Sequence, residues 1–228
     1  MVNSMKKNRT DVKAKKKNKK KKVIIVLILI ILIVVGVFAY TTLNKGNDKI
    51  EEKEKIVDSI KDFDYTISDT DTKLFKTKFN ELKKELKKST IDNKKYSKLV
   101  AELFIIDFFT LDNKITKNDV GGVQFVYSNY KTSFVDKARD QFYKYVKNNL
   151  NDNRNQKLPV VETIKVNSIE EINASDELTT DEFKNIDEAY KVNLSWTYKE
   201  DLGYQTDATV IVVKDANKFS VAKLVEEE

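Results

Sequence analysis

The chain of 228 residues contains no cysteine and no histidine, and it has only one proline and five glycines. Without cysteine it has no disulfides, no thiol nucleophile, no thiolate metal site and no lipidated cysteine of a lipoprotein. Without histidine it lacks the side chain that most often acts as general base. The glycines form neither a GxGxxG nor a GxxxxGK[ST] phosphate loop. A serine nucleophile would therefore need a base other than histidine; lysine could serve, but nothing distinguishes one among the 39.

Positive charge is concentrated in residues 1–22. This tail holds eleven lysines and arginines and one acid, so it carries +10, while the whole chain carries +6 and the remainder therefore −4. Because the remainder is mildly acidic, its composition gives no support to a nucleic-acid surface there. The tail itself is suited to contact with anionic lipid or RNA.

An uncharged stretch follows the tail, from Val23 to Tyr40, and reads VIIVLILIILIVVGVFAY. At 1.5 Å per residue it covers roughly 27 Å, close to the hydrocarbon core of a bilayer, and three more residues complete the span. The lysines that end at Lys22 keep the N-terminus in the cytoplasm. We therefore predict a transmembrane helix at 23–42, with the rest of the chain outside. The alternative is a signal peptide cleaved after Ala39, which the long apolar stretch and long basic region disfavour.

The composition also indicates a source and a location. An outer domain without disulfides is more typical of bacteria than of the eukaryotic secretory route. The 39 lysines against three arginines, with many isoleucines and asparagines, are typical of an AT-rich genome. We expect a protein of the cell membrane of a low-GC Gram-positive bacterium.

Residues 43–66 are expected to form a juxtamembrane helix or linker. Apolar residues recur there among charges at a helix-like spacing, namely Ile50, Ile56, Val57, Ile60 and Phe63. The pattern is too short for a coiled coil. Two interpretations stay open, a stalk and a helix packed on the outer domain.

Residues 67–228 are expected to form one outer domain that begins with helices. Residues 69–72 offer N-caps for a first amphipathic helix, whose apolar face is Phe75, Phe79, Leu82 and Leu86. A second helix, capped by Ser89, Thr90 or Asp92, is apolar nearly all round in its second half, so we place it at the centre of the core. A third helix is expected from Asn118 or Asp119 to about Asn149. Its stripe is mostly aromatic: Tyr127, Tyr130, Phe134, Ala138, Phe142 and Tyr145.

After Pro159 the apolar period changes from about 3.6 to 2, which predicts strands. Residues 160–166 form the first strand, and a polar connection over 167–187 contains a helical turn near 180–183. Residues 190–198 alternate strictly between apolar and polar, which predicts a half-buried strand. Two more strands follow at 206–213 and 219–225. The short turns between them predict antiparallel pairing.

The predicted domain is therefore α+β, with about three helices packed on a curved four-stranded antiparallel sheet. Over residues 23–228 this layout resembles the NTF2-like, or cystatin-like, fold. With its cytoplasmic tail and single span, the chain is similar to the VirB8 family of conjugation and type IV secretion components and to the TcpC-type transfer proteins of Gram-positive bacteria. The resemblance implies a structural assembly subunit rather than an enzyme.

Three acids are weak candidates for chemistry: Asp107, Asp112 and Asp119. Asp107 lies in an apolar run, where burial can raise the pKa of a carboxyl, although pairing with a lysine or a backbone group is the favoured interpretation. A calcium loop starting at Asp112 fails, because the third and fifth positions of the loop are Lys114 and Thr116. A helix cap is the favoured role of Asp119, and a turn or close packing point that of Gly121 and Gly122.

Three functional hypotheses remain. The first is a membrane-anchored assembly protein of the cell envelope, with lipid around its span and tail and with other envelope proteins or further copies of itself as partners. The second is an extracytoplasmic module with an NTF2-like pocket for a ligand or a cell-wall fragment. The third is an envelope enzyme, which would need Asp107 and Asp119 to converge in one cleft. We expect no catalytic residues, no cofactor, no metal, and no nucleic acid bound by the outer domain.

Overall fold

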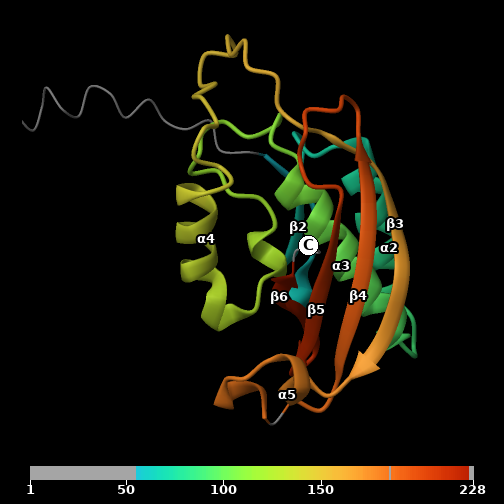
Figure 1. The fold of residues 1–228 in the computed structure, drawn as a ribbon. Helices are drawn as coiled ribbons and strands as arrows, with labels where there is room; N and C mark the ends of the chain where they lie inside the picture. Colours follow the sequence, from blue (N-terminus) through green and yellow to red (C-terminus); the bar gives the residue numbers. More distant parts are fainter. Residues whose placement is uncertain (1–54, 185, 226–228) are drawn as a thin grey trace, which may run out of the picture. The chain divides into compact units, whose positions relative to one another are not determined.

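The computed structural model describes residues 55–184 and 186–225 (Figure 1). The predicted tail, the predicted span at 23–42 and residues 43–54 lie outside the described residues. Over the described ranges, no helix is both long and apolar enough to cross a bilayer. The fold is α+β, with one four-stranded antiparallel sheet, as the order of periodicities predicts.

The first two predicted helices are confirmed as α2 (Lys73–Leu86) and α3 (Asn93–Phe109). Each has the expected kind of N-cap: the Thr72 hydroxyl accepts a hydrogen bond from the Phe75 N–H at 3.2 Å, and the Asp92 carboxylate accepts one from the Lys95 N–H at 3.0 Å. Such caps satisfy amide groups that the first turn of a helix leaves without intrahelical partners.

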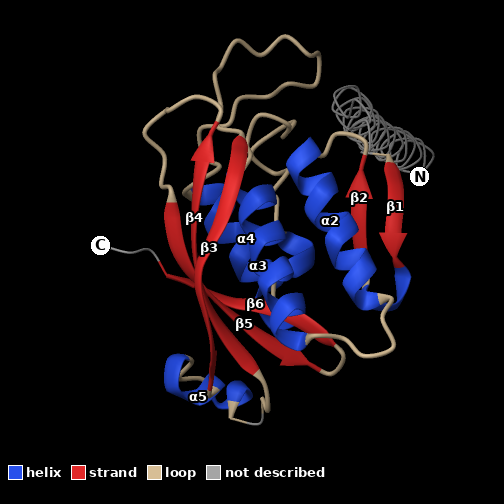
Figure 2. Ribbon diagram, turned by 90° about the vertical axis from the view of Figure 1, so that its right-hand side faces the viewer, coloured by secondary structure: helices blue, strands red, loops and turns tan. Residues whose placement is uncertain are grey.

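Helix α3 is the central element of the core. Twelve of its seventeen residues are buried, as expected for a helix that is apolar on nearly every side. Figure 2 shows α3 lying against the four-stranded sheet, and α2 packs on α3 and also contacts β3. The prediction that this helix lies at the centre of the core is confirmed.

The sheet has the order β3-β4-β5-β6, and every neighbouring pair is antiparallel. Its strands are β3 (Val161–Ile172), β4 (Ala189–Tyr198), β5 (Asp207–Asp215) and β6 (Lys218–Val225). The alternation along β4 is confirmed, because its apolar residues are buried in turn: Tyr190, Val192, Leu194 and Trp196. The predicted meander over the last three strands is thus correct.

Strand β3 is longer than its sequence pattern predicts, because the first six residues of the polar connection expected over 167–187 belong to the strand. The strand continues to Ile172 and pairs with β4 along its whole length. Register shifts between Val161 and Thr163 and between Val166 and Ser168 disrupt the two-residue period that identifies a strand in sequence. The short helix α5 (Ala174–Glu177) and the 3₁₀ turn η5 (Asp181–Phe183) follow, and η5 is the helical turn expected near 180–183.

The helix considered for the 43–66 segment is wrong over its described part. Instead, β1 (Ile56–Ile60), a 3₁₀ turn η2 (Lys61–Phe63) and β2 (Tyr65–Ser68) form a hairpin. β-Branched residues favour strand over helix, and Asp64 takes a left-handed conformation at φ +52° that turns the chain. The side chain of Gln124 fixes β2 by accepting from the Thr66 N–H and donating to the Thr66 carbonyl, at 2.8 and 3.1 Å.

The long third helix expected over 119–149 is also wrong. The chain forms two 3₁₀ turns, η3 (Val123–Phe125) and η4 (Ser128–Tyr130), and only then the short α4 (Lys131–Asp140). Between the two turns the backbone is extended, because the Tyr127 N–H donates to the Val221 carbonyl at 2.9 Å and Val126 bridges the same residue. The pairing with β6 replaces the hydrogen bonds that a continuous helix would make here.

Candidate functional site

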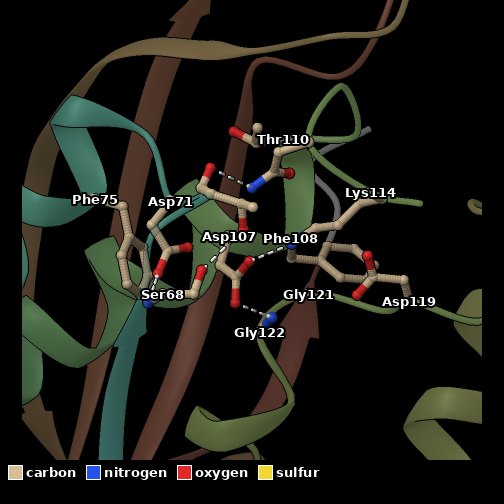
Figure 3. A network of polar contacts seen from close by, with 12 residues as sticks. Ser68, Asp71, Phe75, Asp107, Phe108, Thr110, Lys114, Asp119, Gly121 and Gly122 are labelled. Carbon is tan, nitrogen blue, oxygen red and sulfur yellow. Dashed lines mark hydrogen bonds and ion pairs between the residues drawn. The ribbon is translucent and has the colours of Figure 1, made fainter. Parts of the chain in front are cut away.

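Asp107 lies on the last turn of α3 and is half-buried. One carboxylate oxygen is 2.7 Å from the Lys114 ammonium, and the other accepts from the Gly122 N–H, also at 2.7 Å (Figure 3). The sequence analysis favoured a structural role for Asp107, paired with a lysine or a backbone group, and the structure shows both kinds of partner. The carboxylate therefore connects the end of α3 to the loop that follows it.

Lys114 is one of the residues of this site that sequence reasoning missed, together with Asp71. Its ammonium pairs with Asp107 although its side chain is only 5 % exposed. Burial acts to lower the pKa of this ammonium, but the negative charges of Asp107 and Asp119 outweigh the burial and raise the pKa above the usual value for lysine. The group is a fixed cation rather than a free amine nucleophile. Nothing in the sequence distinguishes it among 39 lysines.

The glycines of this loop are needed for its close approach to α3. A Cβ atom at Gly121 would lie 2.2 Å from the carbonyl oxygen of Asp107, so only glycine fits. Gly122 adopts φ +79°, in the left-handed region that glycine favours. The buried hydroxyl of Tyr143 holds the same contact, since it accepts from the Gly121 N–H at 3.1 Å and donates to the Phe108 carbonyl at 2.7 Å. The close packing point expected at these glycines is confirmed.

Asp119 does not cap a helix, so the favoured role for this residue is wrong. Its carboxylate accepts from the Ile115 N–H at 3.0 Å and closes the loop between them. The next helical element begins only after Gly122. As in a helix cap, the carboxylate stabilises the chain by accepting a hydrogen bond from a backbone amide. Here, however, the element that it stabilises is a turn.

Asp112 lies apart from the others, with a side chain that is 58 % exposed. Its backbone carbonyl accepts from the Arg154 guanidinium at 2.6 Å, while its carboxylate is 4.0 Å from the same group. It is not among the described residues that line the pocket around Asp107. The calcium loop that the sequence disfavours has no counterpart here, and no group of three or more acids within 55–184 and 186–225 is arranged to hold a metal ion.

A polar pocket of about 360 Å³ brings the remaining acids together. Asp71, in the turn between β2 and α2, lines this pocket across Asp107 from Lys114 and Asp119 (Figure 3). Its carboxylate accepts a hydrogen bond from the Ser68 N–H at 2.6 Å. Burial raises the pKa of the Asp71 carboxyl, and the charge of Asp107 adds to that effect. The lining is Ile56, Thr66, Ser68, Asp71, Asp107, Lys114, Asp119, Val120, Gly121 and Gln124.

Three carboxylates and one ammonium give this pocket a formal net charge of −2. Hydroxyl, amide and carboxylate groups of this kind bind amines and polyols by hydrogen bonds. Asp107 and Asp119 do converge on one pocket, which is the geometric condition that the third hypothesis set. Both carboxylates, however, are already engaged by backbone amides, and Asp107 also by Lys114.

The aromatic residues predicted for one helical stripe are mostly core. Phe134 and Phe142 pack on Phe108, with ring centroids 5.2 Å apart in each pair. The Trp196 ring lies 4.6 Å from that of Phe109, so α3 and the sheet are joined by direct ring contacts. The choice of core over ligand pocket is confirmed for Trp196, whereas Phe134 is half-buried and also lines an apolar pocket on the surface. Tyr145, the last residue of the predicted stripe, is 75 % exposed because the helix has ended before it.

A second buried carboxylate, which sequence reasoning also missed, is Glu85 at the end of α2. It is fully buried and lies 2.7 Å from the Lys88 ammonium and 3.0 Å from that of Lys95. The hydrogen bond from Lys88, with help from Lys95 and the Asp92 N–H, lowers the pKa of Glu85 to about 2. This cluster fixes the turn between α2 and α3.

Comparisons with known protein families, with curated proteins and with solved structures find no match to this chain.

Proposed function

We propose that this chain is a single-pass membrane protein of the bacterial cell envelope whose outer domain serves as a structural or assembly subunit, as in conjugation or type IV secretion machines. The uncharged stretch at 23–42 behind a +10 tail supports the anchor. The described α+β order supports the layout that resembles the VirB8 family. Within this proposal the domain is NTF2-like, with its helices packed in the concave face of a curved sheet.

The observation that carries the assembly role is the filled space between α3 and the sheet. In an NTF2-like ligand binder this space would hold the ligand. Here it is occupied by rings in direct contact, such as Phe109 on Trp196 and Tyr96 on Phe219, whose centroids are 4.6 and 5.0 Å apart. A rigid body of this kind offers its outer surfaces to partners. We therefore favour contacts with proteins over a chamber for a small molecule.

Crosslinking in living cells, followed by mass spectrometry, tests this role. Envelope proteins crosslinked reproducibly to the outer domain are the expected result. A protein that stays monomeric and uncrosslinked in its own membrane would contradict it. The anchor is tested separately, because the chain has no cysteine of its own: a membrane-impermeant maleimide should label Lys184→Cys on intact protoplasts but not Lys17→Cys.

A second candidate function is binding of a polar ligand in the pocket around Asp107. The specific observation in its favour is the group of three carboxylates around a space of about 360 Å³. Soluble cell-wall fragments bearing amines or hydroxyls should then raise the melting temperature of the protein. Asp71→Asn should remove that rise while leaving the Asp107–Lys114 pair intact. An equal rise in the variant and the wild type would exclude this pocket.

A further inference from the structure

Among the described residues, four large apolar side chains are exposed to solvent. Ile56 and Val57 begin strand β1, and Tyr145 and Leu150 follow helix α4. The most exposed are Ile56 and Tyr145, at 62 % and 75 %. A single exposed apolar side chain is ordinary, whereas several at one end of a domain indicate a contact surface. We call these four residues the apolar rim.

Both pairs of the apolar rim lie beside the loop 112–120. Ile56 lines the same pocket as residues 119 and 120 of this loop. From the segment after α4, the Asn149 N–H donates to the Ile115 carbonyl at 2.8 Å. Figures 1 and 2 show the start of β1 and the segment after α4 at the end of the domain opposite α5. The four residues therefore belong to one end of the domain.

A β-bulge accounts for the exposure of the first pair. Ile56 pairs with Ser68 and Asp58 with Ile67, so Val57 has no facing residue on β2. Successive residues of a regular strand point to opposite faces, and a bulge re-aims a side chain. Here both Ile56 and Val57 are exposed, so the backbone of the hairpin itself presents them to the outside.

The segment after α4 is also a basic part of an otherwise acidic domain. Residues 141–157 carry four basic side chains and one acid, a net of +3, whereas 23–228 carries −4 in total and therefore −7 outside this segment. Lys144 and Lys147 are exposed on either side of Tyr145 in the sequence, and the Lys144 ammonium lies 5.4 Å from the centroid of the tyrosine ring. Tyrosine and lysine beside apolar side chains are typical of protein surfaces at the headgroup level of a bilayer.

The predicted anchor indicates the same partner. The predicted span ends at residue 42, and Ile56 follows fourteen residues later, a length that reaches at most about 50 Å even when fully extended. The anchor therefore keeps the membrane surface within reach of the apolar rim at all times. No other partner is held beside this end of the domain by the chain itself.

We propose that the apolar rim lies on the outer surface of the membrane, with its apolar side chains among the lipid headgroups and Lys144 and Lys147 on anionic lipid. This inference rests on the anchor of the proposed function and adds an orientation to it. The apolar rim faces lipid, and the end of the domain that carries α5 faces away from it, where other envelope proteins can bind.

Spin labels on the full chain test this contact. The chain has no cysteine, so Val57→Cys, Leu150→Cys and Lys184→Cys each carry a single label at an exposed position. In vesicles of phosphatidylglycerol and phosphatidylcholine, the first two labels should collide with dissolved oxygen, relative to a water-soluble nickel chelate, several-fold more often than the third. Lys184, next to η5, is the matched control at the other end. Equal ratios at all three sites would overturn the proposal.

Two further measurements identify lipid as the partner. A lysine near an anionic surface strengthens binding about fivefold, so Lys144→Gln with Lys147→Gln should lower the ratio of lipid-contacting to water-exposed label at Leu150→Cys roughly 25-fold. An unchanged ratio would refute the role of the two lysines. A label at Leu150→Cys that becomes accessible to nickel when the protein is diluted tenfold in lipid would lie against another copy and would also overturn the proposal. The proposed function is judged by its crosslinked partners, which do not require the apolar rim to touch lipid.

Discussion

Removal of the Lys114 ammonium is expected to cost about 3 kcal/mol of folding stability. Lys114→Met keeps the volume and removes the charge from a pair that is 2.7 Å apart, with side chains 5 % and 13 % exposed. Losing one partner of a buried pair costs about 3–5 kcal/mol. The Gly122 N–H still stabilises the Asp107 carboxylate, which places the cost at the lower end of that range. For a domain of this size the melting temperature should fall by about 6–12 °C.

A double-mutant cycle separates the pair from its surroundings. Asp107→Asn alone leaves Lys114 as a buried cation without its partner, and we expect a loss of about 3–4 kcal/mol. The double variant should lose less than the sum of the single losses, with a coupling of about 2 kcal/mol or more. Thermal unfolding of the full chain in detergent, followed by fluorescence, measures all four proteins under one condition.

The control is an ion pair of similar length on the surface. Lys157 is 2.6 Å from Glu200, but these side chains are 72 % and 55 % exposed. Lys157→Met should therefore change stability by less than about 0.5 kcal/mol. If Lys114→Met melted as close to the wild type as this control, or if the single losses simply added in the double variant, the pair would not be what holds the loop to α3.

Three further changes test other parts of the structure by the same thermal assay. Gly121→Ala should cost about 3 kcal/mol or more of folding stability, because its Cβ would lie 2.2 Å from the Asp107 carbonyl oxygen. The control, Gly203→Ala, is at a positive φ of +73° but has open space around it, and should cost about 1 kcal/mol. Tyr143→Phe should cost about 2–4 kcal/mol, because two buried backbone groups lose their partner. Glu85→Gln should cost about 1–2 kcal/mol at pH 7. The ionised carboxylate stabilises the folded state, so this difference should disappear as the pH falls from 4.5, the ordinary pKa, through about 2, the pKa in the folded protein.

Each of these changes has an outcome that would contradict it. Equal losses at the two glycines would mean that the loop does not depend on close backbone contact. A Tyr143→Phe protein as stable as the wild type would show that its two hydrogen bonds are not formed. A Glu85→Gln protein whose deficit stays constant down to pH 2 would place the origin of that deficit outside the ion cluster.

The two helices and the last three strands could be predicted from sequence because their signals are local. In α2 the apolar residues recur on one helical face and Thr72 caps the first turn, so the helix can be predicted from its own residues alone. In β4 each apolar residue alternates with a polar one because one face is buried and the other is wet. Such periodicities follow from the geometry of the backbone and do not depend on which partner the element meets.

The errors fall where a distant contact decides the local conformation. The aromatic residues from Tyr127 to Phe142 do have helical spacing, but Val126 and Tyr127 extend to pair with Val221, and the helix breaks. The hairpin at 56–68 likewise depends on Gln124, almost sixty residues further along the chain. In β3, bulges remove the alternation itself.

The sequence by itself determined the α+β class, α2, α3, the meander of β4, β5 and β6, and the prediction of an anchor ahead of the domain. Only the tertiary structure decided that Asp71, Asp107, Lys114 and Asp119 surround one pocket and that a loop with two glycines packs closely on α3. It also decided that, among the described residues, β6 has β5 as its only strand neighbour apart from a single bridge to Val126. The physical reason is the sequence distance over which each feature is determined. A helix or strand period depends on neighbouring residues, whereas a pocket and the pairing of an edge strand depend on how separate segments pack, which no local pattern contains.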